Sequence, residues 1–351
     1  MCKGPMHEFL QAVPKCEHHI HVEGSLEPSL LFTLARRNSI NLPSPSDDPA
    51  FSSVSSLLAR YRRFTSLDDF LHYYFIGMSV LVTSDDFESL AYAYFTRAAA
   101  DGVVHAELFF DPQAHTSRGV AYSTVLAGFT AAQARANADL GITSELIVCI
   151  LRHLPPSDGE AMYRAALPDL LSGRVRGLGL SSTEKGNPPH LFKETYLDAE
   201  TRGINRTAHA GEEAGVDYMA EALTELHIQR VDHGIKLTED PAVMAEFVAQ
   251  NIMVTMCPLS NVELCCVKNV GDLPIRKYLD QGVRFSINSD DPAYFGGYIL
   301  DNYCAVQDHF GLTKDEWEKI ARNSIQGSWC GEERKREMGK MLDAVMERFR
   351  T

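Results

Sequence analysis

Eight short apolar runs, rich in β-branched residues, recur along the chain with longer helix-like stretches between them. They lie at 17–22, 103–110, 144–151, 174–180, 205–209, 230–232, 252–256 and 283–288. Strands that alternate with helices favour a parallel sheet, because each crossover helix returns the chain to the same end of the sheet. Eight such units predict a fold of the α/β class, a (β/α)8 TIM barrel.

Helix start signals support this pattern. Thr238 is a suitable N-cap, with Glu239, Asp240 and Pro241 in the first turn that would follow it. Farther along, 313–316 reads Thr-Lys-Asp-Glu, which has the spacing of a capping box and predicts the start of a long C-terminal helix.

One gap breaks the rhythm, because about eighty residues separate the first two strands where a crossover needs a dozen or more. Its first part, 41–56, is rich in Pro and Ser and is predicted to be irregular, whereas 67–82 and 85–100 are amphipathic. Loops that follow barrel strands lie on the C-terminal face, so we expect 41–100 to be a lid-like helical insertion over the active-site mouth. The alternative is a surface helical hairpin without a role. We expect residues 1–351 to form a single barrel domain.

Charge and hydropathy limit the partners and the compartment. The chain has 33 basic and 47 acidic residues, a formal net charge of −14, which argues against nucleic acid as a partner. The longest apolar stretches, such as 75–82, are far shorter than the roughly 20 residues that cross a bilayer, so no membrane association is expected. His7 and Glu8 lie where a signal peptide would need its apolar run. We expect a cytoplasmic protein, with the nucleus as a second location; the sequence does not indicate the oligomeric state.

The first strand carries a pair of histidines on one face. Alternate residues of a strand point the same way, so His19 and His21 are expected to face the barrel mouth together. His18 would lie with Ile20 and Val22 on the opposite, helix-covered face. Two imidazoles side by side make half of a metal site, although such a pair is as often incidental.

Three further polar clusters follow strand ends. His209 and Glu212 come after the fifth strand, His233 after the sixth, and Asp290 with Asp291 after the eighth. Each cluster alone has an ordinary structural explanation, such as a buried histidine or a helix cap. Together the four clusters fall at the C-terminal ends of four separate strands, where barrel enzymes assemble their sites.

This set of side chains suits metal-assisted hydrolysis. Three imidazoles and one carboxylate fit a borderline divalent ion such as Zn²⁺, with one position left for water. Glu212 and His233 then remain for proton transfer and Asp291 for orienting a substrate. Zinc lowers the pKa of a bound water to ~7, which supplies a nucleophile at neutral pH.

The motifs CEHHIHVEGSLEP, HAGEEAG, RVDHGI, MCPLSNV and SINSDDPAYFG, in this order from about residue 14 to about residue 330, resemble those of the adenosine/adenine deaminases in the amidohydrolase superfamily. The resemblance implies a (β/α)8 barrel with one catalytic metal per chain, usually Zn²⁺, with another divalent ion such as Fe²⁺ as the alternative. It makes His19, His21, His209 and Asp290 the ligands.

The resemblance also implies the roles of the other residues. Glu212 would protonate purine N1, and His233 would orient the attacking water and help to deprotonate it. Asp291 would bond N7, and the backbone of Ser182 would lie near N3 beneath the ring. Hydroxide can add to C6 of an aromatic purine only if the electrons displaced into the ring are neutralised, which an acid at N1 achieves. Ammonia then leaves.

The resemblance is closest to the adenine deaminase subgroup. Relatives that act on nucleosides resemble H-x-H-x-D-G, whereas this chain has Glu23 before Gly24, and its longer side chain would fill ribose space and bond N9–H of a free base. The segments 110–113 and 118–119 also resemble that subgroup. The expected reaction is zinc-dependent hydrolysis of adenine to hypoxanthine and ammonia, in purine salvage. The alternative is that Glu23 only pairs with a nearby basic side chain.

Ser181 stands where the subgroup commonly has aspartate, and His18 where leucine is usual. Because Ser181 would lie close to the ring, adenosine and an N6-substituted adenine of the cytokinin type remain alternative substrates.

Other functions fit less well. The other zinc deaminases, which act on cytosine or on adenine in nucleic acid, need P-C-x-x-C, which Cys257-Pro258-Leu259 does not supply. A two-metal barrel hydrolase would need a bridging carboxylate or modified lysine where Ser181 and Ser182 stand. An inactive barrel that serves as a binding module would be expected to have lost a ligand or an acid.

Overall fold

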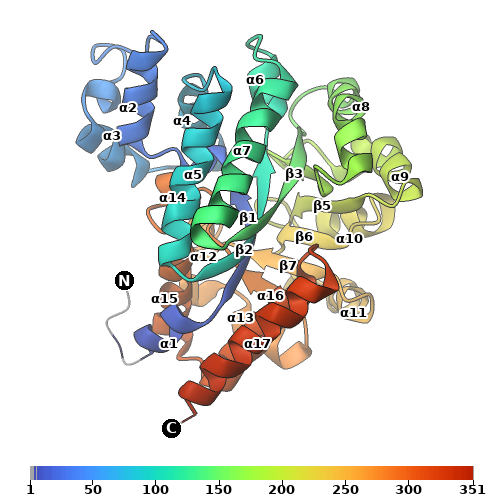
Figure 1. Ribbon diagram of the computed structural model, residues 1–351. Helices are drawn as coiled ribbons and strands as arrows, with labels where there is room; N and C mark the ends of the chain where they lie inside the picture. Colours follow the sequence, from blue (N-terminus) through green and yellow to red (C-terminus); the bar gives the residue numbers. More distant parts are fainter. Residues whose placement is uncertain (1–3, 5, 351) are drawn as a thin grey trace.

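The computed structural model describes residues 4 and 6–350, and its eight strands pair in chain order as one parallel sheet (Figure 1). The strands are β1 (Lys15–His21), β2 (Val103–Phe110), β3 (Thr143–Leu151), β4 (Gly177–Ser181), β5 (Asn205–Ala210), β6 (Arg230–His233), β7 (Met253–Met256) and β8 (Arg284–Ile287). All eight predicted strands are confirmed. β4 begins later than expected, because the backbone N–H of Val175 still bonds the carbonyl of Asp169 (3.1 Å).

The sheet curls into a nearly closed TIM barrel. The backbone after β8 meets β1, since His21 N–H donates to the carbonyl of Asp290 and Asp290 N–H donates to the carbonyl of His19, both at 3.0 Å. This closure brings the C-terminal ends of β1 and β8 together at one face of the barrel. His18 faces outward as expected, and its ring nitrogens contact the hydroxyls of Ser286 (3.0 Å) and Ser328 (2.9 Å).

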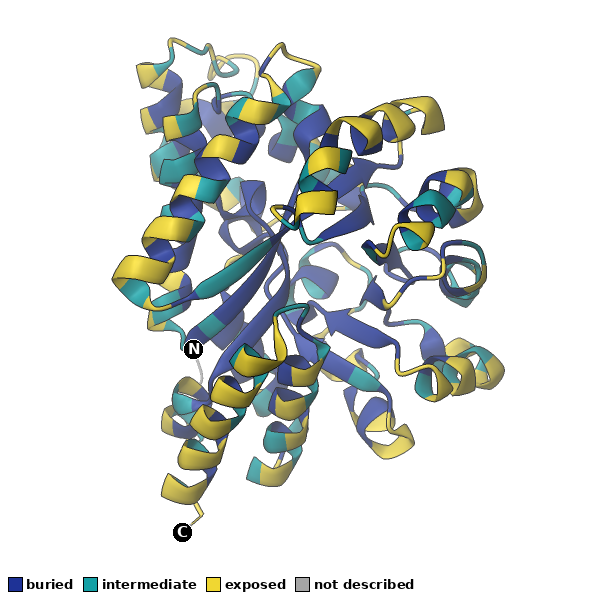
Figure 2. Ribbon diagram, turned by 45° about the vertical axis from the view of Figure 1, so that its right-hand side comes forward, coloured by how far each residue is buried: buried dark blue, intermediate teal, exposed yellow. Residues whose placement is uncertain are grey.

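Helices surround the barrel, and Figure 2 shows their outer faces exposed around buried strands. They are α1 (His7–Ala12), α2 (Pro28–Arg37), α3 (Val54–Tyr61), α4 (Leu67–Met78), α5 (Ser84–Ala100), α6 (Pro112–Thr116), α7 (Tyr122–Leu140), α8 (Pro156–Ser172), α9 (Lys193–Thr201), α10 (Val216–Glu225), α11 (Pro241–Ala249), α12 (Pro258–Glu263), α13 (Ile275–Gln281), α14 (Pro292–Phe295), α15 (Ile299–Phe310), α16 (Lys314–Gly327) and α17 (Glu332–Arg348). Short 3₁₀ helices are η1 (Glu23–Ser25), η2 (Pro49–Ser52), η3 (Pro189–Phe192), η4 (Leu237–Glu239) and η5 (Val270–Asp272).

The strands alternate between two apolar regions. Leu146, Val148 and Ile150 of β3 pack outward into the large core beneath the helices. Ile147 and Cys149 point the other way and form a small interior cluster with Phe109. This alternation is what the strand pleat dictates, and it fills the barrel interior below the C-terminal face.

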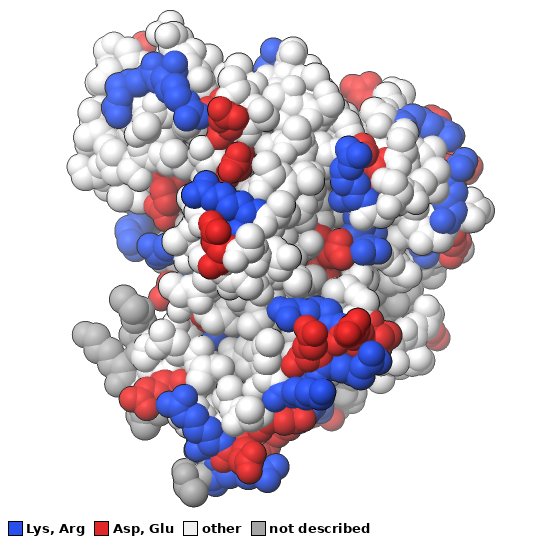
Figure 3. Space-filling view, viewed as in Figure 1, with Lys and Arg blue, Asp and Glu red and all other residues white. Residues whose placement is uncertain are grey.

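The capping box at the start of α16 is confirmed. Thr313 Oγ1 accepts from Glu316 N–H (3.2 Å), and Glu316 Oε2 accepts from Thr313 N–H (2.8 Å). The expected long C-terminal helix is two helices, because α16 ends at Gly327 and α17 begins at 332. On the face seen in Figure 3, basic and acidic side chains are interspersed along α17, where Arg334 pairs with Glu337.

The predicted N-cap at Thr238 is wrong. Thr238 lies within η4, and Asp240 caps α11 instead, with its Oδ1 accepting from the backbone N–H of Ala242 at 2.8 Å. Asp240 takes this position because Pro241, with its fixed φ and missing N–H, suits the first helical position.

The long connection between β1 and β2 contains α2 to α5. The two amphipathic stretches predicted within it are α4 and α5, whereas α3 starts at Val54, inside the stretch predicted to be irregular, because Ser53 caps it by accepting from Ser56 N–H (3.1 Å). α5 packs beside α7, where Phe87 contacts Phe129. The lid role of 41–100 and the single-domain organisation of 1–351 stay predictions.

None of the helices within residues 4 and 6–350 is both long and apolar enough to cross a membrane.

Candidate active site

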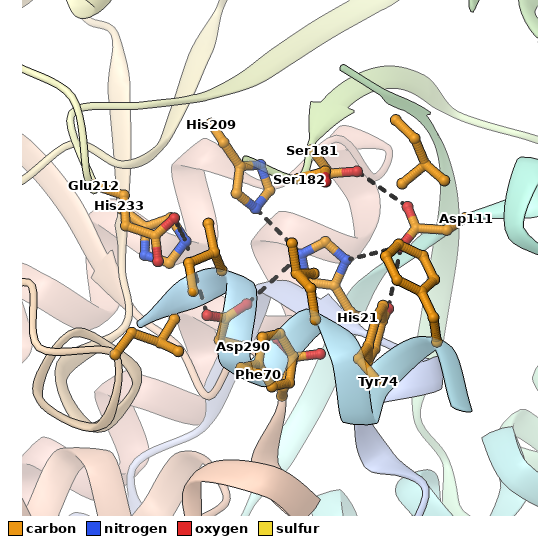
Figure 4. Close-up of a pocket in the computed structure, with 16 residues that line it drawn as sticks. His21, Phe70, Tyr74, Asp111, Ser181, Ser182, His209, Glu212, His233 and Asp290 are labelled. Carbon is orange, nitrogen blue, oxygen red and sulfur yellow. Dashed lines mark hydrogen bonds and ion pairs between the residues drawn. The ribbon is translucent and has the colours of Figure 1, made fainter. Parts of the chain in front are cut away.

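A pocket opens among the C-terminal ends of the strands (Figure 4). Its wall combines polar side chains from the strand ends with apolar side chains from α4: His21, Leu67, Phe70, Leu71, Tyr74, Phe75, Asp111, Leu151, Ser181, Ser182, His209, Glu212, His233, Leu264, Asp290 and Asp291. Every predicted site residue therefore lines the pocket except His19 and Glu23, which are fully buried next to it.

The four predicted metal ligands converge. Asp290 Oδ1 lies 3.1 Å from His19 Nε2 and 3.6 Å from His21 Nε2, and the Nε2 atoms of His21 and His209 are 3.2 Å apart. Ser260 donates to the other oxygen of Asp290 at 2.6 Å, which fixes the carboxylate.

The outer nitrogens of two of these histidines lie beside polar side chains. His19 Nδ1 lies 2.9 Å from Thr255 Oγ1, and His209 Nδ1 lies 3.4 Å from Asp232 Oδ2. Such contacts orient the rings and leave Nε2 free for a metal. Among the described residues, His19 Nε2 has no hydrogen-bond partner. A buried imidazole nitrogen without a partner, beside a carboxylate and two further imidazole nitrogens, fits a divalent cation well.

His233 lies at the edge of this cluster. Its Nε2 is 3.5 Å from Glu212 Oε2 and 3.8 Å from Asp290 Oδ2, and its Nδ1 is 3.2 Å from the side-chain amide nitrogen of Asn261. His19, His209, His233 and Asp290 each present an atom within 4.8 Å of the others, so His233 is close enough to act on anything the cluster holds.

Burial lowers the pKa of His21 to about 3 and that of His233 well below its ordinary value. Burial also acts to lower the pKa of His209, but the neighbouring Asp232 outweighs it and raises that pKa. Burial alone would raise the pKa of Asp290, but His19 and His233 outweigh it and hold that pKa well below its usual range. Neutral imidazoles and an ionised carboxylate are the forms that bind a metal.

The pKa values of two acids that face the pocket are shifted upward. Glu212 is 3% exposed, its Oε1 has no hydrogen-bond partner in the described structure, and burial with the charges of Asp290 and Glu184 raises its pKa well above the ordinary value. Burial and the adjacent Asp290 likewise raise the pKa of Asp291 well above its usual range. Both carboxyls are thus suited to carry a proton at neutral pH.

Backbone conformation aims Glu212 at the pocket. β5 ends at Ala210, and Gly211 turns the chain with a φ of +74°, where a Cβ would collide with Met219. Glu184 then accepts from the N–H groups of Glu213 (2.9 Å) and Ala214 (2.7 Å), the two residues that follow Glu212.

Three of the predicted site residues adopt left-handed backbone conformations that non-glycine residues rarely take. The φ angles are +77° at Ser182, +62° at His233 and +66° at Asp290. Each costs of the order of 1–3 kcal/mol and persists only where the surrounding structure enforces it, a pattern that clusters at functional sites.

The structure places Glu23 differently from the expectation. Its Oε1 accepts from Asp111 N–H (3.2 Å) and lies 3.0 Å from His115 Nε2, so it has the nearby basic partner of the alternative interpretation. Burial raises its pKa to about 7. Direct contact of Glu23 with a substrate stays a prediction.

Sequence reasoning did not single out several residues of the wall. Asp111 was noticed only within a segment that resembles the adenine deaminase subgroup, and Phe70 and Tyr74 only as part of an amphipathic stretch. A signal for Asp111 existed, because it follows a strand and precedes a proline just as Asp291 does. No such pattern marks Phe70 and Tyr74, whose position depends on how α4 packs.

The chain matches the family model described as adenosine deaminase over residues 14–346. An adenine deaminase from Aspergillus oryzae is 55% identical over 350 residues, 99% of each chain. The crystal structure of an adenine deaminase from Arthrobacter aurescens superposes with a TM-score of 0.89 and 41% identity over 96% of this chain and 99% of the other. An amidohydrolase from Burkholderia ambifaria, solved with bound Zn, gives a TM-score of 0.82 and 26% identity over 99% of this chain and 96% of the other.

Proposed function

The chain belongs to the adenosine deaminase family, and from this membership we propose that it hydrolyses free adenine to hypoxanthine and ammonia. The observation that carries the proposal is the pairing of Glu212 with His233 at 3.5 Å, in the wall of a pocket and beside the converging side chains of His19, His21, His209 and Asp290. The names of the full-length relatives support adenine as the substrate.

We propose that His19, His21, His209 and Asp290 hold one Zn²⁺ per chain, with Fe²⁺ as the alternative. Their donor set supports this, and so does the buried Nε2 of His19, which lies 3.1 Å from Asp290 Oδ1 and has no hydrogen-bond partner in the described structure. When bound, the ion would lower the pKa of a water to ~7 and so make a nucleophile available at neutral pH.

The protein groups supply the proton chemistry. His233, kept neutral by burial, can orient the attacking water and accept its proton. Glu212, kept protonated, can give its proton to N1 as the water oxygen adds to C6, so that the ring does not carry negative charge. His233 then returns the proton it took from water to the 6-amino group, and the carboxylate of Glu212 takes up the proton of the hydroxyl on C6. Ammonia leaves as the C6–N bond breaks and the C6 carbonyl of hypoxanthine forms.

Two groups can orient the ring. Asp291 has a raised pKa, so it can donate a hydrogen bond to N7, which is an acceptor in the common tautomer of adenine. The backbone of Ser182 lies in the pocket wall, where its N–H can meet N3. Glu23 is proposed to act at the N9 end of the base.

The test is the ratio of kcat/KM for adenine, adenosine, AMP and an N6-substituted adenine with purified protein, followed by ammonia release. We expect adenine to be preferred. A wide preference for adenosine would refute the choice of the free base, preference for the N6-substituted base would favour that alternative, and no ammonia from any of the four would favour an inactive barrel. Elemental analysis should find one zinc per chain, and a second ion would favour a two-metal hydrolase.

The biological setting follows from the reaction. We propose a role in purine salvage, with a purine base and water as the partners and neither nucleic acid nor membrane involved, in the cytoplasm.

A further inference from the structure

Asp111 is the carboxyl in the pocket wall that the mechanism does not use. It follows β2 and starts α6 ahead of Pro112, with φ −112° and ψ 73°, and Asp291 has nearly the same conformation, φ −117° and ψ 72°, after β8 and ahead of Pro292. Two strand ends therefore present a carboxyl to the pocket by the same local structure.

The two ends of the pocket differ in their chemistry. Figure 4 shows Glu212 and His233 together on one side, His21 near the middle, and Asp111 with Ser181 on the other side. Asp111 Oδ1 accepts from the hydroxyl of Ser181 and Oδ2 from that of Tyr74, both at 3.1 Å. The Asp111 end thus presents a carboxyl that accepts from two hydroxyls, and the imidazole beside it in the pocket wall is that of His21, whose Nδ1 lies 3.9 Å from Asp111 Oδ2.

The surrounding contacts fix Asp111 in this position. Its side chain is 2% exposed, and its backbone N–H is held by Glu23, which is itself fully buried against His115. His115 Nδ1 in turn lies 2.8 Å from a guanidinium nitrogen of Arg118, whose Nη2 also donates to backbone carbonyls in the turn after α4. Glu23 therefore acts behind Asp111 rather than on the pocket surface.

We propose, on the basis of the proposed function, that Asp111 accepts the N9–H of the purine and makes the enzyme specific for the free base, with Glu23 as the residue that positions it. With C6 and N1 directed at His233 and Glu212, the opposite edge of the purine carries N3 and N9, and this edge meets Asp111. A nucleoside has carbon on N9, so it offers Asp111 no donor and places a sugar where Asp111, Tyr74 and Ser181 are packed.

The preference for adenine over a 9-substituted analogue can be estimated, because the analogue leaves the buried carboxyl of Asp111 without its hydrogen-bond donor. A site built to hydrogen-bond a substrate N–H rejects an analogue without it by up to about 10⁴–10⁵-fold. Removing the acceptor should abolish most of that preference while leaving the chemistry at C6 in place.

The experiment compares adenine with 9-methyladenine in the wild type, Asp111→Ala and Asp111→Asn. In the wild type we expect kcat/KM to favour adenine by at least about 10³-fold. In Asp111→Ala we expect adenine to lose about 100-fold while 9-methyladenine loses little or improves, so that the ratio collapses. An equal loss on both substrates, or an unchanged ratio, would overturn the proposal. If Asp111→Ala does not fold, Asp111→Asn decides, because it keeps the shape and should still reduce the ratio at least tenfold.

Two further variants separate positioning from structure. Glu23→Gln should raise KM for adenine more than it lowers kcat, and should leave both constants for 9-methyladenine near their wild-type values; a fall in kcat alone would contradict its role. Asp240→Ala is the matched control, since Asp240 also starts a helix ahead of a proline but does not line the pocket. Its adenine preference should equal that of the wild type.

Product binding distinguishes failure of this inference from failure of the proposed reaction. Calorimetric titration with hypoxanthine and 9-methylhypoxanthine reports recognition at N9 without turnover. Discrimination that depends on Asp111 without ammonia release from adenine would refute only the reaction. Ammonia release with no effect of Asp111 on either ratio would refute only the inference.

Discussion

Replacing Glu212 with Gln gives the sharpest test of the proposed chemistry. Glu212 is buried, and its raised pKa keeps a proton on it at neutral pH, so it is suited to protonate a ring nitrogen. The amide of Gln has nearly the same shape and can donate a hydrogen bond to N1, but it cannot transfer a proton. We therefore expect KM for adenine to change little and kcat to fall.

The size of the fall can be estimated. Positioned proton transfer contributes about 10²–10⁴-fold, and each factor of ten corresponds to about 1.4 kcal/mol in the barrier, so Glu212→Gln should cost about 3–5 kcal/mol in transition-state stabilisation. The four proposed metal ligands are untouched, so metal content should equal that of the wild type.

The assay is the initial rate of ammonia release at saturating adenine, with zinc measured on the same samples. Glu213→Gln is the matched control, because Glu213 follows Glu212 on the same loop but does not line the pocket and pairs with Lys185 at 3.4 Å. It should keep kcat within a few-fold of the wild type. A Glu212→Gln enzyme within tenfold of wild-type kcat, with its zinc in place, would refute the role of Glu212.

The other predictions concern the metal, a buried ion pair and helix α4 in the pocket wall. Dialysis against a strong chelator should abolish ammonia release and added Zn²⁺ should restore it; activity above a tenth of the original in metal-free protein would contradict the assigned ligands. Burial alone would raise the pKa of Glu107, but Arg230, 2.5 Å away, outweighs it and holds that pKa well below its usual range. The ion pair therefore stabilises the fold fully above the unfolded-state pKa of about 4.3, and this contribution is lost as the pH falls. Arg230→Met should therefore lower the free energy of unfolding in urea by about 3–5 kcal/mol at pH 7 and by less at pH 4, and an equal loss at both would contradict the charge argument. Thr183 donates to Asp68 of α4 at 2.9 Å, so Thr183→Val should weaken the seating of α4 and raise KM several-fold with little change in kcat; a fall in kcat alone would argue against α4 as a cover.

Much of the fold was predictable because strand signals are local. Apolar runs and their turn residues mark all eight strands within a few residues, and the alternation along β1 correctly separates His19 and His21 from His18. Errors arose where two local signals competed. Thr238 and Asp240 are both good N-caps, and only the proline after Asp240 decides between them.

The candidate site was predictable to the extent that it depends on strand ends. A parallel barrel brings those ends together whatever lies between them. His21 therefore lies 3.2 Å from His209 and 3.6 Å from Asp290, and the ring centroids of His19 and His233 are 4.6 Å apart, although the sequence places these residues far apart. The positions of the strand ends do not determine whether a side chain reaches the pocket surface or stays buried behind it. Glu23 and Asp111 are both acids at the C-terminal face, and the sequence favoured Glu23 for the substrate edge.

The sequence by itself determined the barrel, the order of its strands and which strand ends carry the clustered histidines and Asp290, because each depends on residues close together in the chain or on a symmetry that all parallel barrels share. Only the tertiary structure decided that α4 lines the pocket with Phe70 and Tyr74, and that Asp111 reaches the pocket while Glu23 lies behind it. Those outcomes depend on packing between segments about forty to ninety residues apart, and packing selects one side chain for each space by volume and hydrogen bonding, which no local pattern encodes.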